Sequence, residues 1–250
     1  MKKDKLRVED IINRFRYQDS FTAKQLYGFY IQEEPELNMG TFRWRVYSLK
    51  ENGIIRSFKR GIYVLEGSKK FKPSIPQKIT RIYNQIKRHF PYAEALIWDT
   101  AWLHDFTIHQ PVFSFVIVEV DKEAINSVYE MLKEKKGDVY IYYPKKEINH
   151  TIPGNSIVIK PYLKESPVKR LEKIIAPKIE KILVDLYYEK SLFITYQGIE
   201  KNNIFENIFN EYSINMTTLY RYARHRAIKE KIRKYLLSQL STREYLFKEI

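Results

Sequence analysis

The sequence predicts an α+β protein in three parts, divided near residues 72 and 165. Three observations predict this order. Two helical segments and a short hairpin follow one another between residues 20 and 65. β-rich runs alternate with helical periodicity between 77 and 160, and from 167 onward apolar residues recur at helical spacing. A chain of 250 residues is long enough to bury two or three separate cores.

The first helix of the N-terminal part is predicted to begin after Thr22. Thr22 is a favourable N-cap residue and Gln25 follows three positions later, so the two side chains can form a capping box. Phe21 and Leu26 stand at the N′ and N4 positions, where a hydrophobic staple fixes the direction in which the chain enters a helix. These local interactions predict a helix from residue 23 onward.

A second helix is predicted from Asn38 to Glu51, ended by Asn52-Gly53. One face is apolar, because Phe42, Val46 and Leu49 recur at i, i+4 and i+7. The remaining faces are polar, basic or aromatic, and at 100° per residue they carry Thr41, Arg43, Trp44, Arg45, Tyr47 and Ser48. The helix therefore has one side suited to a core and another suited to a partner.

A basic hairpin follows this helix, because the β-rich runs 54–55 and 62–65 flank the turn Lys59-Arg60-Gly61. Two helices followed by a hairpin predict a winged helix-turn-helix over residues 1–72. In such a module the second helix enters the major groove, where arginine binds guanine, and the wing contacts phosphates. The residues predicted to face duplex DNA are Lys24, Thr41, Arg43, Trp44, Arg45, Ser48, Lys59 and Arg60. The alternative is a winged helix that only binds other proteins.

Proline-containing segments divide the rest of the chain. A basic linker with two prolines over 69–76 ends the first part. An α/β unit over 73–165 follows, with helices at 77–90 and 124–135 and strands at 95–98, 113–120, 139–143 and 156–160. The strand 113–120 is the most apolar and is expected at the centre of the sheet. A helical region over 166–250 is predicted, with helices after Pro167 and Pro177, at 199–212 and at 216–240.

The distribution of charge along the chain also indicates phosphate-rich partners. The net charge is +14, and it is concentrated at the two ends of the chain. Residues 1–72 hold 16 Lys/Arg against 9 Asp/Glu, and residues 217–250 hold 9 against 3. The C-terminal cluster interleaves arginine with tyrosine, an arrangement that suits stacking and phosphate contact. Its candidate partner-binding residues are Arg221, Arg224, Arg226, Lys229 and Arg233, and a solvated helix face is the alternative.

Several function classes are excluded or disfavoured by the sequence. The chain has no cysteine, so a disulfide framework and a thiol nucleophile are excluded. The N-terminus has no apolar segment typical of a signal peptide, and no apolar run approaches the length of a membrane span. We therefore expect a cytoplasmic protein that does not contact a membrane, and we expect no cofactor or metal.

The main catalytic alternative is a metal-dependent nuclease. Asp99, Glu119 and Asp121 lie near strands of the α/β unit, and Lys122 follows them closely. Carboxylates and a lysine on a strand pair are how such nucleases hold magnesium and position water. The lysine position that this arrangement usually requires, two residues after the second acid, is occupied by Asp121. We therefore predict no catalytic residues and no enzyme activity.

The chain resembles the AbiEi-type antitoxins, a family of winged-helix transcriptional regulators from type IV toxin–antitoxin systems of abortive infection. The resemblance rests on the second helix with its wing (41–49 and 60–63) and on later motifs at 97–103, 108–111, 171–188 and 219–223. It implies an antitoxin that represses its own operon by binding an inverted repeat and that opposes a nucleotidyltransferase toxin in phage defence, without necessarily binding the toxin directly. Matching positions imply DNA contacts by Thr41, Arg43, Trp44, Arg45, Lys59 and Arg60. A plain transcription factor with a ligand-sensing α/β unit is a third alternative.

Overall fold

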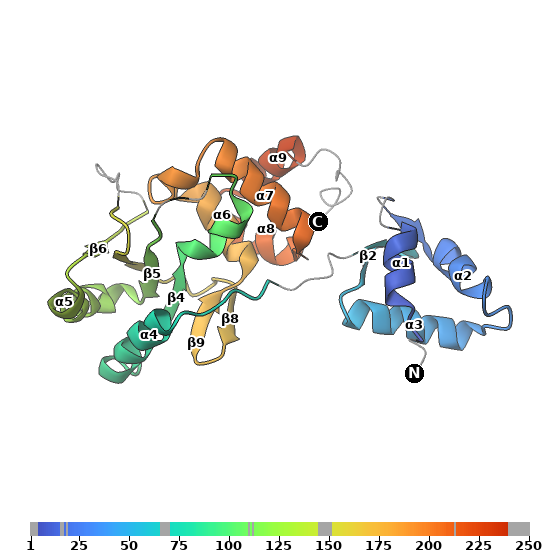
Figure 1. The fold of residues 1–250 in the computed structure, drawn as a ribbon, viewed down its shortest axis with the longest axis horizontal. Coiled ribbons are helices and arrows are strands. Elements are labelled where there is room, and N and C mark those ends of the chain that lie inside the picture. The colour runs from blue at the N-terminus through green and yellow to red at the C-terminus, as the bar shows by residue number, and fades with distance from the viewer. Residues whose placement is uncertain are drawn as a thin grey trace. The chain divides into compact units, whose positions relative to one another are not determined.

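The computed structural model describes residues 5–15, 18, 20–65, 71–109, 111, 113–144, 152–212 and 214–239. It is an α+β protein, as the sequence predicts, and it divides into two compact units. The first unit consists mainly of residues up to Lys70, and the second consists of residues 71–208 and 214–235 (Figure 1). Residues 66–70, which include the first two residues of the predicted linker, lie outside the described residues.

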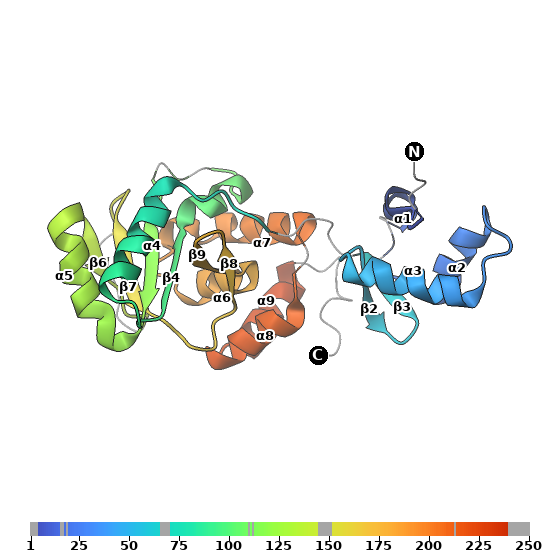
Figure 2. The same cartoon turned by 90° about the horizontal axis from the view of Figure 1, so that it is seen from below.

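The first unit contains three helices and a three-stranded antiparallel sheet in its described part. The sheet has the order β1-β3-β2, and α3 lies beside the β2–β3 hairpin (Figure 2). In chain order the elements are α1 (Val8–Phe15), β1 (Phe21–Thr22), α2 (Ala23–Ile31), α3 (Met39–Glu51), β2 (Ile55–Lys59) and β3 (Ile62–Leu65). The two predicted helices and the hairpin with its basic turn are thus confirmed.

Local chemistry fixes the helix ends of this unit. The Thr22 hydroxyl accepts a hydrogen bond from the Gln25 amide at 3.1 Å, and the Gln25 side chain accepts one from the Thr22 amide at 2.7 Å. This is the predicted capping box. Asn38 caps α3 by accepting from the Thr41 amide at 2.8 Å, and Gly53 supplies the positive φ of 66° that ends the helix.

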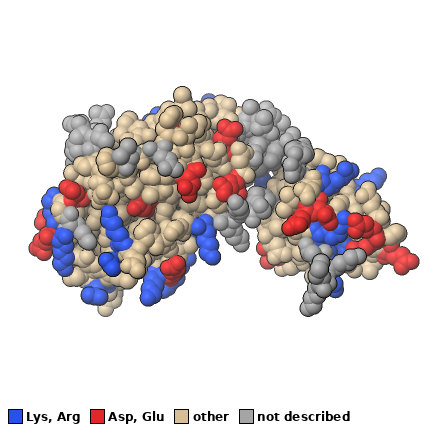
Figure 3. All heavy atoms as spheres, viewed as in Figure 1, with Lys and Arg blue, Asp and Glu red and all other residues tan. Residues whose placement is uncertain are grey.

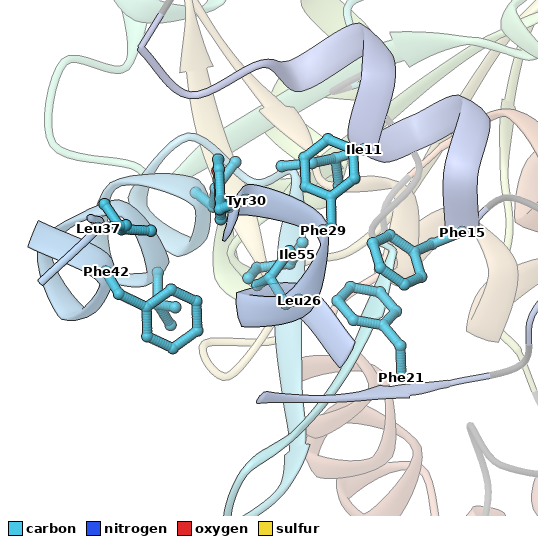
Figure 4. Packing of buried hydrophobic residues seen from close by; sticks show 11 residues of the cluster. Ile11, Phe15, Phe21, Leu26, Phe29, Tyr30, Leu37, Phe42 and Ile55 are labelled. Carbon is cyan, nitrogen blue, oxygen red and sulfur yellow. The ribbon is translucent and has the colours of Figure 1, made fainter. Parts of the chain in front are cut away.

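Aromatic side chains dominate the core of the first unit (Figure 4). The rings of Phe15 and Phe21 stack with centroids 4.1 Å apart, and Tyr27 meets Phe42 edge to face at 5.1 Å. The core therefore joins α1, β1, α2 and α3. Burying each such side chain contributes about 1.5–3 kcal/mol, so the orientation of α3 is set by the apolar stripe that the sequence shows.

The second unit is built on a four-stranded sheet with the order β4-β5-β7-β6. Its strands are β4 (Ala95–Asp99), β5 (Val116–Val120), β6 (Val139–Ile141) and β7 (Ile157–Pro161). β4 pairs with β5 in antiparallel fashion, while β7 is parallel to both β5 and β6. Every residue of β5 is buried, which confirms the prediction of a central strand covered on both faces.

Helices cover both faces of this sheet (Figure 1). The helices α4 (Gln77–His89) and α5 (Ile125–Lys136) lie together on one face, where the Gln85 amide meets the Met131 sulfur at 3.3 Å. The other face is covered by α6 (Ile179–Tyr188), against which α8 (Met216–His225) packs. The unit is completed by three short 3₁₀ turns, η1 (Thr100–Phe106), η2 (Lys122–Ala124) and η3 (Ile194–Tyr196), and by α7 (Ile199–Glu211) and α9 (Lys229–Gln239).

Three predictions about this part of the chain are wrong or differ from the structure. The helix expected after Pro167 is a hairpin, β8 (Val168–Leu171) and β9 (Ile174–Pro177), which turns at Glu172 with a φ of 49°. The helix predicted after Pro177 is present as α6 (Ile179–Tyr188), although Pro177 itself ends β9 and Lys178 is the N-cap. The long helix 216–240 breaks at Ala227, whose φ is 56°. The expected division between 73–165 and 166–250 is also not seen, because both stretches contribute to the second unit.

Candidate functional site

The outer face of α3 carries the most distinctive exposed surface of the first unit. Phe42, Val46 and Leu49 are buried on its inner face, while Arg43, Trp44 and Tyr47 point to solvent. Trp44 is 53% exposed and Tyr47 is 60% exposed. The helix thus presents a cation and two aromatic rings on a rigid element whose back is fixed in a core.

Two further cations lie close to each other at the edge of this unit. Lys24 is exposed in the first turn of α2, and Arg60 is exposed at the tip of the β2–β3 hairpin. The Ala23 amide donates to the Gly61 carbonyl at 2.7 Å, and this bond ties the residue before Lys24 to the residue after Arg60. Lys59 belongs to β2, but its side chain lies outside the described residues. Thr41 and Ser48 are partly exposed.

Arg45 does not belong to this surface, and its prediction as a DNA contact is wrong. Its side chain is only 6% exposed. The guanidinium pairs with the Glu34 carboxylate at 2.7 Å and lies over the Tyr30 ring at 4.6 Å. From the helical spacing, Arg45 was expected on the polar side of α3. The link between α2 and α3, which contains Glu34, folds over this part of the helix and encloses Arg45. Arg45 therefore supports the fold of the first unit.

We expect Arg45→Ala to lower the free energy of unfolding of the first unit by about 1–3 kcal/mol, since it removes a buried charge-assisted hydrogen bond. Arg43→Ala, on the same helix, should change it by less than about 0.5 kcal/mol, because Arg43 is exposed. Urea denaturation followed by far-ultraviolet circular dichroism measures both. Equal stability of the two variants would contradict the structural role of Arg45.

A fully buried cluster of charges forms the centre of the second unit. It contains three cations and three carboxylates, namely Lys160, Lys181, Arg226, Glu119, Asp185 and Glu189. Glu119 and Lys160 come from β5 and β7, Lys181 and Asp185 come from α6, and Arg226 follows α8. The cluster thus connects the sheet to the helices that cover it, on both sides of the boundary that was predicted at residue 165.

Asp185 has the largest number of partners in this cluster. It accepts hydrogen bonds from the Tyr222 hydroxyl at 2.8 Å, from Arg226 at 2.7 Å and from Lys160 at 3.3 Å, and it also pairs with Lys181. Burial by itself raises the pKa of Asp185, but the three cations outweigh it and hold the pKa well below its ordinary value. The carboxylate is therefore ionised in the folded protein.

Glu189 and Glu119 are the other two acidic residues of the cluster, and burial raises the pKa of Glu189 above its ordinary value. Glu189 binds Lys160 at 2.6 Å and Arg226 at 2.6 Å, and Glu119 binds Lys181 at 2.6 Å. Burial alone would lower the pKa of Lys160 and Lys181, but the neighbouring carboxylates raise it above the ordinary lysine value. Ion pairs of this kind are expensive to desolvate and fix a particular packing of the elements that supply them.

The acids of the nuclease alternative are not brought together. Asp99 is paired in register with Val116 on β5, and Glu119 lies three residues further along that strand. Because side chains alternate along a strand, Asp99 and Glu119 project from opposite faces of the sheet. Glu119 is already engaged by Lys181, and Asp121 accepts from the Glu94 amide. Among the described residues, no group of three metal-binding side chains is placed to hold a metal ion.

The predicted C-terminal basic surface is only partly present. Arg221 and Arg224 are exposed on α8. Arg226 is not, since its side chain is 7% exposed within the charge cluster, so its assignment to a partner surface is wrong. Lys229 lies over the Tyr220 ring at 5.6 Å, and Arg233 approaches Glu230 at 3.8 Å. Arg226 follows the buried Leu219 and Tyr222 at i+7 and i+4, so it lies on the inner face of α8, and its side chain donates to the Tyr222 hydroxyl at 3.2 Å.

A further basic surface was not predicted from the sequence, because the net charge of residues 73–216 is close to zero. The helix α4 carries Lys78, Arg81, Lys87 and Arg88 and no acidic residue. Lys and Arg side chains gather over α4 and the β8–β9 hairpin in Figure 3. The cluster members Lys181, Asp185 and Glu189 were also missed, although their i, i+4, i+8 spacing within an apolar helix is a signal that they share one buried face.

These observations define an α+β protein with an exposed basic and aromatic helix face in its first unit and a buried ionic core in its second. The chain belongs to DUF6577, a family of unknown function, whose model matches residues 41–242. The match includes most of α3 and every described residue of the second unit. No curated protein matches the chain. None of the described helices is long and apolar enough to cross a membrane.

Proposed function

We propose that the protein is a DNA-binding transcriptional regulator and that its first unit is a winged helix-turn-helix. The element order α1-β1-α2-α3-β2-β3 with the sheet order β1-β3-β2 supports this reading of the fold. The observation that carries the function is the exposed face of α3, where Arg43, Trp44 and Tyr47 project from a helix held firmly by its apolar side. A recognition helix needs one face that is packed in the core and an opposite face whose side chains can contact DNA.

In the proposed complex α3 enters the major groove of the operator. Arg43 donates two hydrogen bonds to a guanine, and Arg60 at the hairpin tip contacts backbone phosphates together with Lys24. Exposed arginines of α4 in the second unit, Arg81 and Arg88, are candidates for additional phosphate contacts. The net charge of +14 favours the encounter with DNA at any sequence, so specificity rests on the face of α3.

The test is binding of the full chain to DNA from upstream of its own gene, measured at several salt concentrations. We expect Arg43→Ala to weaken binding by about 1–3 kcal/mol and to relax discrimination against unrelated DNA. Arg60→Ala should weaken binding to all sequences alike and reduce the slope of log K against log salt by about 1.

Arg14→Ala is the matched control, because Arg14 is an exposed arginine on α1 of the same unit. It should leave affinity and specificity unchanged. If the wild type does not prefer the upstream DNA to unrelated DNA, or if Arg43→Ala and Arg14→Ala bind equally well, the proposed function is wrong.

The biological role that we propose is that of an antitoxin in a type IV toxin–antitoxin system, which represses its own operon and counteracts a nucleotidyltransferase toxin. This role rests on the sequence resemblance to AbiEi-type antitoxins together with the second exposed basic surface on α8. Arg221 and Arg224 are its candidate residues, since planar guanidinium groups pair with carboxylates and phosphates alike.

A further inference from the structure

The exposed apolar side chains of the first unit are concentrated in one place. Within the described part of this unit, the large apolar side chains with high exposure are Met39 at 49%, Trp44 at 53% and Tyr47 at 60%. All three belong to the outer face of α3. Exposure of this much apolar surface on one helix face is typical of a surface that a partner covers.

The arrangement of these side chains around Arg43 identifies the kind of partner surface. Met39 and Tyr47 lie four residues before and after Arg43, and are therefore its neighbours along the helix, while Trp44 lies beside it. Arg43 is thus flanked by three exposed apolar or aromatic side chains, and a second exposed cation, Lys50, follows one turn beyond Tyr47. A shallow hollow lined by Gly40, Thr41 and Trp44, among others, continues the patch toward the start of the helix.

The major groove offers one apolar group among its hydrogen-bonding atoms, the C5-methyl group of thymine. We propose that Trp44 and Tyr47 contact thymine methyl groups, so that the protein selects thymines on either side of the base bound by Arg43. This inference rests on the proposed function and adds the chemistry by which the site is specific. In this proposal the bases are recognised mainly by apolar contact. Within the first three turns of α3, Arg43 is the one exposed cation that can donate hydrogen bonds to bases.

Replacement of thymine by uracil tests the proposal without changing the base sequence or the phosphates. The upstream DNA is amplified once with dTTP and once with dUTP, and the full chain is titrated with both duplexes. Burial of one methyl group accounts for roughly a fourfold change in affinity. We therefore expect the wild type to bind the uracil duplex at least about tenfold more weakly if two or more methyl groups are contacted.

Variants show which side chains sense the methyl group. Trp44→Ala combined with Tyr47→Ala should weaken binding to the thymine duplex and reduce the thymine/uracil ratio to less than about twofold. Arg43→Ala should weaken binding to both duplexes and keep the ratio. Tyr92→Ala, which removes a fully exposed tyrosine of the second unit, is the matched control and should change neither.

The possible results separate this inference from the proposed function. If the wild type binds both duplexes equally while binding still depends on Arg43, the inference is wrong and the proposed function stands. If the ratio persists in the Trp44/Tyr47 double variant, the protein senses DNA shape and not the methyl group, which also overturns the inference. Failure of the folded wild type to bind either duplex in preference to unrelated DNA contradicts both.

Discussion

Asp185→Asn is expected to lower the free energy of unfolding of the second unit by about 3–5 kcal/mol, since removing one partner of a buried ion cluster leaves the others uncompensated. The carboxylate receives hydrogen bonds from Tyr222, Lys160, Lys181 and Arg226. The amide has nearly the same shape but no charge, so three buried cations face only two carboxylates. Urea denaturation followed by the fluorescence of the buried Trp98 and Trp102 measures the loss.

Asp138→Asn is the control, because Asp138 is exposed in the same unit and its replacement should change the stability by less than about 0.5 kcal/mol. An Asp185→Asn variant with the stability of this control would contradict the assignment of the cluster as the ionic core of the unit.

The same carboxylate makes the stability of the second unit depend on acid. Its folded pKa lies well below the ordinary value of 3.8. A lowered folded pKa means that the stabilisation is present above the unfolded pKa and is lost as the pH falls through the folded one. The wild type should therefore lose stability below about pH 3.8, and Asp185→Asn should lack this part of the loss. Unfolding titrations of both proteins between pH 5 and pH 2 measure the difference.

Repression and antitoxicity are expected to be separable by single-surface variants of the full chain. Arg43→Ala with Arg60→Ala should abolish repression of the operon but leave rescue of toxin-expressing cells intact. Arg221→Glu with Arg224→Glu should do the opposite, because reversing the charge of a surface that binds carboxylate or phosphate groups of a partner costs several kcal/mol of affinity. A reporter under the native promoter and survival during induction of the toxin measure the two activities.

Arg226→Glu distinguishes a surface effect from a folding effect. It places a carboxylate beside Asp185 and Glu189 in the core of the second unit, so it should destabilise the protein and reduce rescue through loss of folded protein. The Arg221/Arg224 variant should retain wild-type circular dichroism. If it rescues cells as well as the wild type, or if the abundant, folded Arg43/Arg60 variant fails to rescue, the proposed division of labour is wrong.

The sequence by itself determined those elements whose ends are fixed by neighbours along the chain. Three such features are the capping box of Thr22 and Gln25, the Asn38 cap and the turn at Gly61. Each depends on residues only a few positions apart, so it can be predicted from the sequence. The apolar stripe of α3 was equally visible, because a period of 3.6 residues separates a buried face from an exposed one. Arg43 could be placed on the surface for this reason, whereas Trp44 could equally have been a packing residue, and the structure shows it exposed.

The tertiary structure alone decided which of the charged residues are buried. Arg45 and Arg43 are indistinguishable by type and nearly adjacent, yet Glu34 and Tyr30 enclose only Arg45. The hairpin of β8 and β9 replaced an expected helix. Leu171, Ile174 and Ile175 have helical spacing, but a short apolar run is also compatible with a strand, and pairing between the two strands decided between them.

The charge cluster is the extreme case, since Lys181 meets Glu119 across 62 residues of sequence. The cost of burying an ion is set by partners that the fold brings from distant segments, and no local pattern reports where those partners are.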